Sequence, residues 1–391
     1  MFSLLFMIYL AFISLGLPDT VLGAAWPSMQ PQLGVNLSFA GILSMIISIG
    51  TISSSFLSGY FIKRYSSGLI TLVSVGLTTV SLLWIGLFPS VASLIIVSVF
   101  LGFGGGNVDV ALNHFVSKHY DAKHMNWLHS FWGIGATAGP MLISLSLILN
   151  QGWQGGYLFI GLLQLVFAYY LYRSLPKFKA KEEKSTFSLA DGPKVKQKHS
   201  LSSGLAKLSL TAFFLYCAME ATAGLYGASY LYAIKGVSNE MAAIGASLYY
   251  AGITLGRIFS GFASMKYKNQ SLIEFGVMIS GIGVVLVMVL PTFYSIAGFI
   301  LIGIGLAPIY PALIHETPKR FDHQTAASLL GKQMGFAYIG VATMPFVFSR
   351  LLTSWPIDIF GPYVFFLFLL LTFSVTAYNQ MAKRRKPNEI I

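Results

Sequence analysis

Apolar residues run through this chain in long blocks, which short polar or proline- and glycine-containing segments separate. An α-helix needs about 20 mostly apolar residues to cross the hydrocarbon core of a bilayer. Twelve blocks reach that length, so the pattern predicts an all-α polytopic membrane protein. The predicted spans are 5–30, 37–62, 69–88, 91–118, 124–149, 153–174, 205–234, 238–265, 271–290, 293–317, 323–352 and 358–382.

The composition agrees with a chain that lies mostly in lipid. Hydrophobic residues make up 55% of the sequence and charged residues 10%, whereas a soluble domain has about 25% charged residues. The single cysteine, Cys217, excludes an intrachain disulfide and a cysteine-based metal site. The first apolar block lacks a basic region and a cleavage site, so we interpret it as a span and not as a removable signal.

Basic residues collect in alternate loops. All but four of the 25 Lys and Arg residues fall on one side of the predicted spans, the exceptions being Lys235, Arg257, Lys332 and Arg350. Cytoplasmic loops of membrane proteins are enriched in Lys and Arg, so both termini are expected in the cytoplasm. The same distribution accounts for the net charge of +12 without nucleic-acid binding.

The longest polar stretch, 175–204, predicts a cytoplasmic linker between two six-span halves, 1–174 and 205–391. The halves resemble each other at an offset of about 201 residues. The matching pairs are Gly102 with Gly303, Gly104 with Gly305, Ala111–His114 with Ala312–His315, Lys118 with Lys319, Asp121 with Asp322, Gly59 with Gly261, and Arg64 with Lys266. We infer an internal duplication giving two pseudo-symmetric bundles, and repeats of this kind hold their substrate near the middle of the membrane.

Three of the 13 acidic residues lie inside predicted spans: Asp19, Asp109 and Glu220. An unpaired charge at that depth costs about 3 kcal/mol or more. Membrane proteins that keep such groups generally use them to carry a proton or to hold a substrate. The competing interpretation is an acid satisfied by neighbouring backbone or hydroxyl groups.

The two acids of the first half differ in their surroundings. Asp19 follows Pro18, which removes a backbone donor and can open the helix to water. Asp109 follows Gly104, Gly105, Gly106 and Asn107, and close helix packing there would favour its protonated form. Asn113 shares its helix face and is a candidate substrate contact. We rank Asp109 first and Asp19 second as the proton carrier. A glycine face that only packs tightly is the alternative for Asp109.

Span 5 carries Asn126, His129 and Trp132 among small residues. Aromatic faces stack on sugar rings, while the amide and imidazole can bind hydroxyls, so these three are candidate substrate contacts. An ordinary hydrogen-bonded core histidine is an equally good interpretation of His129.

The second half offers its own candidate substrate contacts in Glu220 of span 7 and in Lys332 and Gln333 of span 11, with a structural ion pair as the alternative for Glu220. Lys332 and Gln333 in span 11 lie roughly 15 Å from the cytoplasmic end at 1.5 Å per residue, and Glu220 or a first-half acid is the expected partner of Lys332. Tyr226 and Tyr230 share a face of span 7 and are either substrate contacts or bundle filling.

The twelve spans, the central loop and the basic segment 59–65 resemble the major facilitator superfamily of transporters. The resemblance implies gating roles for Gly59, Arg64 and Arg257, although the usual loop aspartate is replaced by Lys63. Lys63–Ser66 with Gly68, the acids of spans 1 and 4, and the segment 126–133 are similar to the fucose permease-like sugar symporters.

These features predict a monomeric, proton-coupled symporter for a sugar or related small polar solute, in a bacterial inner membrane, with sodium coupling as a variant. The alternatives are a proton-driven exporter of drugs or metabolites and, less favoured, a membrane receptor. No nucleotide motif, nucleophile–base set or metal-ligand spacing of histidines occurs, so we expect neither enzymatic activity nor a cofactor.

Overall fold

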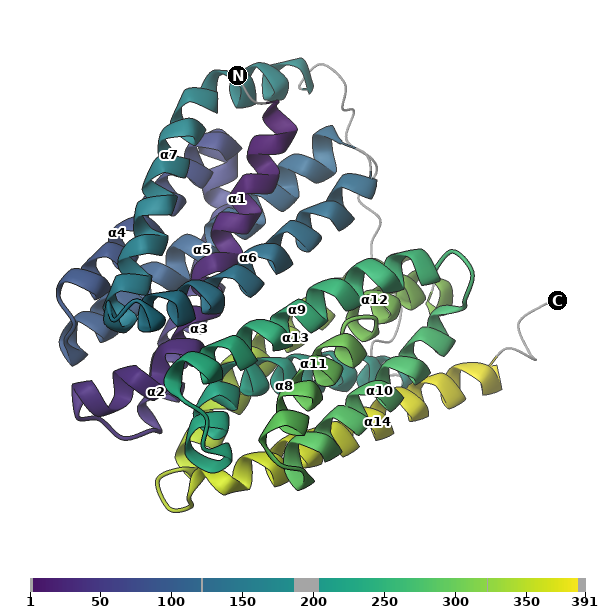
Figure 1. Ribbon diagram of the computed structural model, residues 1–391. Helices are drawn as coiled ribbons and strands as arrows, with labels where there is room; N and C mark the ends of the chain where they lie inside the picture. The colour runs from purple at the N-terminus through teal and green to yellow at the C-terminus, as the bar shows by residue number, and fades with distance from the viewer. Residues whose placement is uncertain (1–2, 121, 186–203, 322, 386–391) are drawn as a thin grey trace. The chain divides into compact units, whose positions relative to one another are not determined.

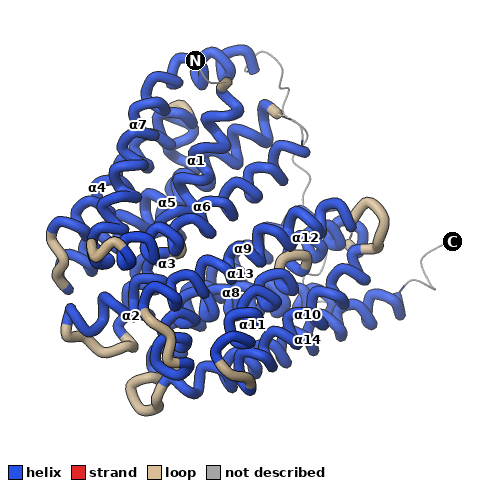
Figure 2. Tube along the Cα trace, in the orientation of Figure 1, coloured by secondary structure: helices blue, strands red, loops and turns tan. Residues whose placement is uncertain are grey.

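The computed structural model describes residues 3–120, 122–185, 204–321 and 323–385, and its elements are all helices (Figure 1, Figure 2). The helices of the first half are α1 (Leu4–Asp19), α2 (Val21–Leu33), α3 (Phe39–Arg64), α4 (Ser67–Leu87), α5 (Val91–His119), α6 (Ala122–Ile148) and α7 (Gly152–Ser185). Those of the second half are α8 (Gly204–Lys235), α9 (Asn239–Ala263), α10 (Asn269–Val289), α11 (Thr292–Leu306), α12 (Ile309–Arg320), α13 (His323–Leu351), the short 3₁₀ helix η1 (Ile357–Ile359) and α14 (Phe360–Arg385).

The predicted polytopic membrane fold is confirmed. Among the described residues, 11 helical segments are long and apolar enough to cross a bilayer. α1 with α2 makes the first of them, and α11 with α12 makes another. The predicted eighth span forms α9, which is too polar to be counted among the 11.

The chain divides into two compact units. Unit 1 comprises Met1–Gly192 with Val237–Ser247, and unit 2 comprises Pro193–Gly236 with Leu248–Ile391. α7 continues as a helix to Ser185, so the first part of the predicted linker 175–204 is helical. Residues 186–203 lie outside the described residues.

Local chemistry explains where several helices begin and end. Ser3, Ser66 and Ser90 precede α1, α4 and α5, and each side-chain oxygen accepts a hydrogen bond from the backbone N–H three residues later. This satisfies one of the donors that a helix start leaves free. α2 ends at Gly34, whose φ of 64° lies in the left-handed region that glycine adopts without strain.

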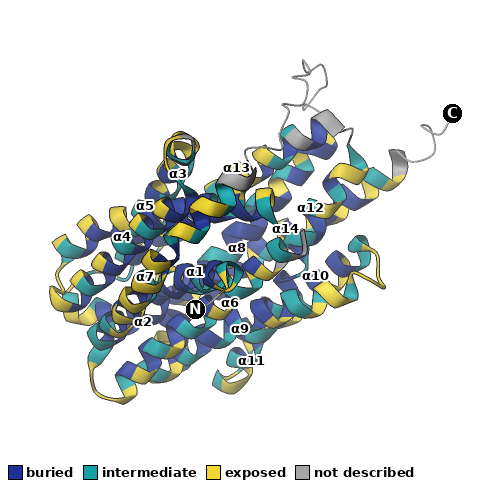
Figure 3. Cartoon of the chain, turned by 90° about the horizontal axis from the view of Figure 1, so that it is seen from above, coloured by how far each residue is buried: buried dark blue, intermediate teal, exposed yellow. Residues whose placement is uncertain are grey.

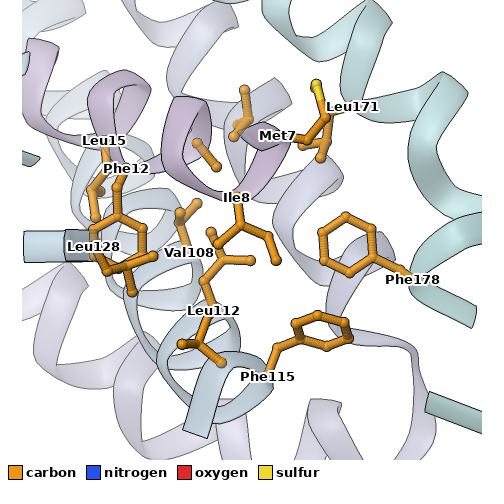
Figure 4. Packing of buried hydrophobic residues seen from close by; sticks show 13 residues of the cluster. Met7, Ile8, Phe12, Leu15, Val108, Leu112, Phe115, Leu128, Leu171 and Phe178 are labelled. Atoms are coloured by element: carbon orange, nitrogen blue, oxygen red, sulfur yellow. The ribbon is translucent and has the colours of Figure 1, made fainter. Parts of the chain in front are cut away.

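The interior of unit 1 is built around α1. Met7, Ile8, Phe12 and Leu15 of α1 pack on buried residues of α5, α6 and α7, as Figure 4 shows for Leu112, Phe115, Leu128, Leu171 and Phe178. Exposed side chains lie mostly on the outer faces of the helices (Figure 3) and include many large hydrophobic residues. That distribution is expected of helices whose outer surface contacts lipid.

Glycines set the same helix contacts in both units. A Cβ on Gly102 of α5 would clash with Ile47 of α3, and one on Gly303 of α11 would clash with Tyr249 of α9. Gly50 of α3 contacts Val99 and Phe103, whereas Gly252 of α9 contacts Ile300 and Ile304, and these contacted residues differ by 201 positions. The repeat seen in the sequence therefore corresponds to repeated packing within each unit.

Candidate functional site

Asp19 lies at a break in the first span. Pro18 has no backbone N–H, so the carbonyl of Ser14 loses its usual helical partner. The side-chain amide of Gln164 on α7 donates to that carbonyl at 2.6 Å. α1 ends at Asp19, and Thr20 separates it from α2. α1 thus stays helical through Pro18 and breaks at Thr20, and the backbone carbonyl that Pro18 frees is satisfied.

The carboxylate of Asp19 has a neutral partner. The indole Nε1 of Trp132 on α6 donates to its Oδ2 at 2.8 Å, and the Asp19 side chain is otherwise exposed. α6 comes close to α1 because glycines line the contact: Gly16 faces the Trp132 carbonyl, and Gly135 and Gly139 face carbonyls of α1. A side chain at any of these glycines would push Trp132 away from Asp19.

Asp109 is the second acid of this site. Asn113, one turn further along α5, donates from its side-chain amide to the Asp109 Oδ1 at 2.8 Å. Asp109 is half-buried and close enough to Asp19 for the two carboxylates to interact electrostatically. Unit 1 thus gathers Asp19, Asp109, Asn113 and Trp132 from α1, α5 and α6, and neighbouring like charges oppose the ionisation of both acids together.

The remaining span 5 candidates lie along the same helix. His129 is exposed, one turn before Trp132, with its ring edge-on to Phe12 at a centroid distance of 5.8 Å. Asn126 lies in α6, but its side chain is outside the described part of the structure.

Unit 2 holds a separate charged group. The Arg257 Nη2 of α9 lies 3.6 Å from the Glu220 Oε1 of α8, and the two side chains are 20% and 16% exposed. Arg257 also interacts electrostatically with Tyr216 of α8 and Tyr310 of α12, whose rings are 5.4 Å apart. The Tyr249 hydroxyl donates to the Glu220 backbone carbonyl at 3.1 Å. The group is an ion pair surrounded by tyrosines.

Packing shows that Glu220 is the counterpart of Asp19. Gly135 of α6 sits against Ile13 and Leu17 of α1, and Gly340 of α13 sits against Phe214 and Ala218 of α8. The contacted residues differ by 201 positions, as do Asp19 and Glu220. The same offset is visible in the sequence, so this equivalence can be found without the structure.

The other second-half candidates lie elsewhere. Tyr226 and Tyr230 are buried, with rings against Phe348 and Phe360, which favours bundle filling over substrate contact. Gln333 is fully buried and donates to Ser209 at 2.6 Å and to Thr317 at 2.9 Å. These three side chains hold the helices of unit 2 together.

Among the described residues, Glu220 does not pair with Lys332. Glu220 pairs with Arg257 instead, which the sequence had assigned only to gating. Lys332 is exposed on α13. Which residue Glu220 pairs with depends on how the helices are rotated about their axes. The position of a residue along a span does not reveal that rotation.

The loop residues expected to gate lie at the surface of unit 1. Gly59 is exposed, with open space where a Cβ would lie. Arg64, at the end of α3, is exposed and donates to the Tyr60 hydroxyl at 3.1 Å. The Lys63 side chain is outside the described part of the structure.

Comparison with known proteins finds relatives along most of the chain. The profile of the Major Facilitator Superfamily matches residues 8–218. The glucose/mannose transporter GlcP of Bacillus subtilis is 21% identical over 346 residues, which cover 85% of this chain and 84% of that protein. Membrane protein MosC of Rhizobium meliloti is 22% identical over 334 residues, 81% of this chain and 75% of that protein.

Solved structures share the fold at low sequence identity. The nucleoside transporter NupG superimposes with a TM-score of 0.74 at 13% identity, over 97% of this chain and 100% of that one. A bacterial homologue of the human lysosomal transporter Spinster gives 0.69 at 14% identity, over 97% and 96% of the two chains.

Proposed function

The chain belongs to the Major Facilitator Superfamily and is a secondary transporter, not an enzyme, and we propose that it takes up a sugar or related small polar solute together with protons. The observation that carries the proposal is the contrast between two equivalent acids. Asp19 has a neutral partner in Trp132, whereas Glu220 has a permanently charged partner in Arg257.

That contrast assigns different roles to the two units. The Glu220 carboxylate lies beside the opposite charge of the Arg257 guanidinium, which commits it to an ion pair within unit 2. A carboxylate beside an indole N–H and a second carboxylate gains and loses a proton more easily. Asp109 and Asp19 therefore form the proton site as a coupled pair, in which Asp109 is the first choice for the carrier.

The Glu220–Arg257 pair suits an uncharged polar substrate. Together the two groups offer hydrogen-bond acceptors and donors without a net charge. The half-buried Tyr310, which packs against the buried Tyr216, adds a flat face beside the pair, and such a face packs against the apolar side of a sugar ring. The similarity to a glucose/mannose transporter supports a sugar as the substrate.

Coupling follows from the charge of the unit 1 site. A proton taken from outside neutralises the acid pair and allows the loaded carrier to turn inward. Release of the proton into the more alkaline cytoplasm then weakens substrate binding. Thermodynamic linkage makes the effect reciprocal, so the substrate must also favour proton binding.

The test begins with thermal stabilisation of the purified protein across a panel of sugars and metabolites, because a bound ligand raises apparent stability by mass action. The stabilising compound is then followed into liposomes with an imposed pH gradient. Asp109→Asn should abolish accumulation against a concentration gradient while exchange of labelled for unlabelled substrate continues, since exchange needs no net proton movement.

The matched control is Asp358→Asn, which neutralises an exposed acid in η1 and should leave accumulation unchanged. Accumulation in Asp109→Asn with the pH dependence of the parent would contradict Asp109 as the proton carrier. Proton-driven extrusion of an apolar cation, with no response to any sugar, would favour the exporter alternative.

A further inference from the structure

A groove follows the outer surface of α14 in unit 2. Its first part is a cavity of about 320 Å³ between α10 and α14. Its second part is a shallow, open surface along α14 alone. Thr376 and Gln380 line both parts, so the open surface adjoins the cavity. α10 and α14 lie side by side (Figure 1), and both contribute residues at helical spacing.

The groove is polar at one end and apolar along its length. The polar end is lined by Gln270, Glu274, Asn379, Gln380 and Lys383. The walls beyond it are mainly apolar, formed by Ile273, Val277, Val375, Leu369 and Phe373. An elongated surface with one charged end and one apolar end matches an amphipathic lipid better than a compact solute.

Its length fits one leaflet of a bilayer. From Gln380 to Leu369 the helix advances roughly 16 Å at 1.5 Å per residue. Half of a hydrocarbon core is about 15 Å thick. The polar end includes Lys383, which starts a run of four basic residues in the sequence. Because basic residues are enriched on the cytoplasmic side, we place the groove in the cytoplasmic leaflet.

The charges at the polar end indicate the headgroup. Glu274 is an acceptor that already receives the Gln270 side-chain amide at 2.7 Å, and Lys383 is a donor at the same rim. One acid and one base match a headgroup that carries an ammonium and a phosphate. Behind the rim, the half-buried Arg320 donates from Nε to Glu316 and from Nη2 to Asn379, while its Nη1 has no hydrogen-bond partner among the described residues.

We propose that the groove between α10 and α14 binds one phosphatidylethanolamine molecule, with its ammonium at Glu274, its phosphate at Lys383 and an acyl chain beside Phe373. A primary ammonium can donate hydrogen bonds to Glu274, whereas the trimethylammonium of phosphatidylcholine cannot. Phosphatidylglycerol supplies no cation for Glu274. This lipid site is independent of the transported substrate.

The experiment measures how many lipids the purified full-length protein retains in native mass spectrometry after exposure to phosphatidylethanolamine, phosphatidylcholine or phosphatidylglycerol of the same acyl chains. One phosphatidylethanolamine should be retained preferentially. Glu274→Gln and Lys383→Gln should each weaken that retention roughly fivefold, as expected for the loss of one exposed charge contact. Thr376→Trp should block the groove without changing any charge.

The control is Lys268→Gln, which removes an exposed charge at the start of α10 outside the groove and should retain the lipid as the parent does. Thermal unfolding of each variant without added lipid verifies that it is folded. Equal retention of the three lipids, a preference for phosphatidylglycerol, or unchanged retention in Thr376→Trp would overturn the proposal. None of these readouts involves transport.

Discussion

The partner of a carboxylate decides what the carboxylate can do. Asp19 and Glu220 occupy equivalent positions in the two units, yet one accepts a hydrogen bond from Trp132 and the other pairs with Arg257. The sequence located both acids, because charged residues stand out in apolar spans. It did not identify Arg257 as the partner of Glu220, since that depends on how α8 and α9 are rotated against each other.

Glu220→Gln tests the ion pair of unit 2. The substitution leaves the Arg257 guanidinium at a mostly buried position without its carboxylate, and should destabilise unit 2 by about 1–2 kcal/mol. The loss is smaller than for a fully buried pair because both side chains retain some accessible surface. The measurement is the thermal unfolding midpoint of the purified protein.

Two further variants make this test specific. The double variant Glu220→Gln, Arg257→Gln should recover part of the loss, because no unpaired charge remains. Asp19→Asn is the matched control at the equivalent position: its side-chain oxygen can still accept from Trp132, so little change is expected. A Glu220→Gln protein as stable as the parent would show that the ion pair contributes nothing to stability.

At the level of helices, glycines fix which spans approach most closely. α6 contacts α1 through Gly135, and α13 contacts α8 through Gly340. The apolar blocks predicted the spans because a run of about 20 apolar residues has the length that a helix needs to cross the bilayer. They did not predict the break at Ala307 and Pro308 between α11 and α12, nor the continuation of α7 to Ser185. The mean hydropathy of a segment reflects how apolar it is, and it does not detect a short break in a helix.

Two glycines of α13 provide a prediction with an internal control. A Cβ at Gly340 would clash with the Phe214 carbonyl of α8, whereas one at Gly335 meets nothing within 4 Å. Gly340→Ala should therefore cost about 1–3 kcal/mol through overpacking. Gly335→Ala should be neutral or slightly stabilising, because alanine restricts the unfolded chain more than glycine does. Thermal unfolding in detergent distinguishes the two, and equal midpoints would contradict the proposed contact.

For the molecule as a whole, the strongest information in the sequence is its duplication and its charge asymmetry. The offset of about 201 residues reappears as equivalent glycine contacts within each unit. Equivalent positions nevertheless carry different chemistry: Asp109 corresponds to Tyr310 at that offset. The fold could be predicted from repetition, whereas the site could not, because its function depends on where the two halves differ.

The last prediction concerns orientation across the membrane. The single native cysteine, Cys217, is buried and should not react with a membrane-impermeant maleimide applied to intact cells. Ser354, in the turn between α13 and α14, and Ser264, in the turn after α9, are exposed. The basic-residue distribution places the Ser354 turn outside and the Ser264 turn inside. Ser354→Cys should therefore be labelled in intact cells, and Ser264→Cys only after permeabilisation.

Labelling of Ser264→Cys but not of Ser354→Cys in intact cells would reverse the orientation of the protein in the membrane. It would move the Lys383 end of the groove to the outer leaflet, and it would reverse the sense in which a proton gradient drives the proposed site. Labelling of both turns in intact cells would instead indicate leaky membranes. The parent protein cannot serve as the control for leakage, because the buried Cys217 should stay unlabelled in either case. A cytoplasmic marker enzyme that remains unlabelled in the same cells excludes leakage, so each outcome identifies one orientation.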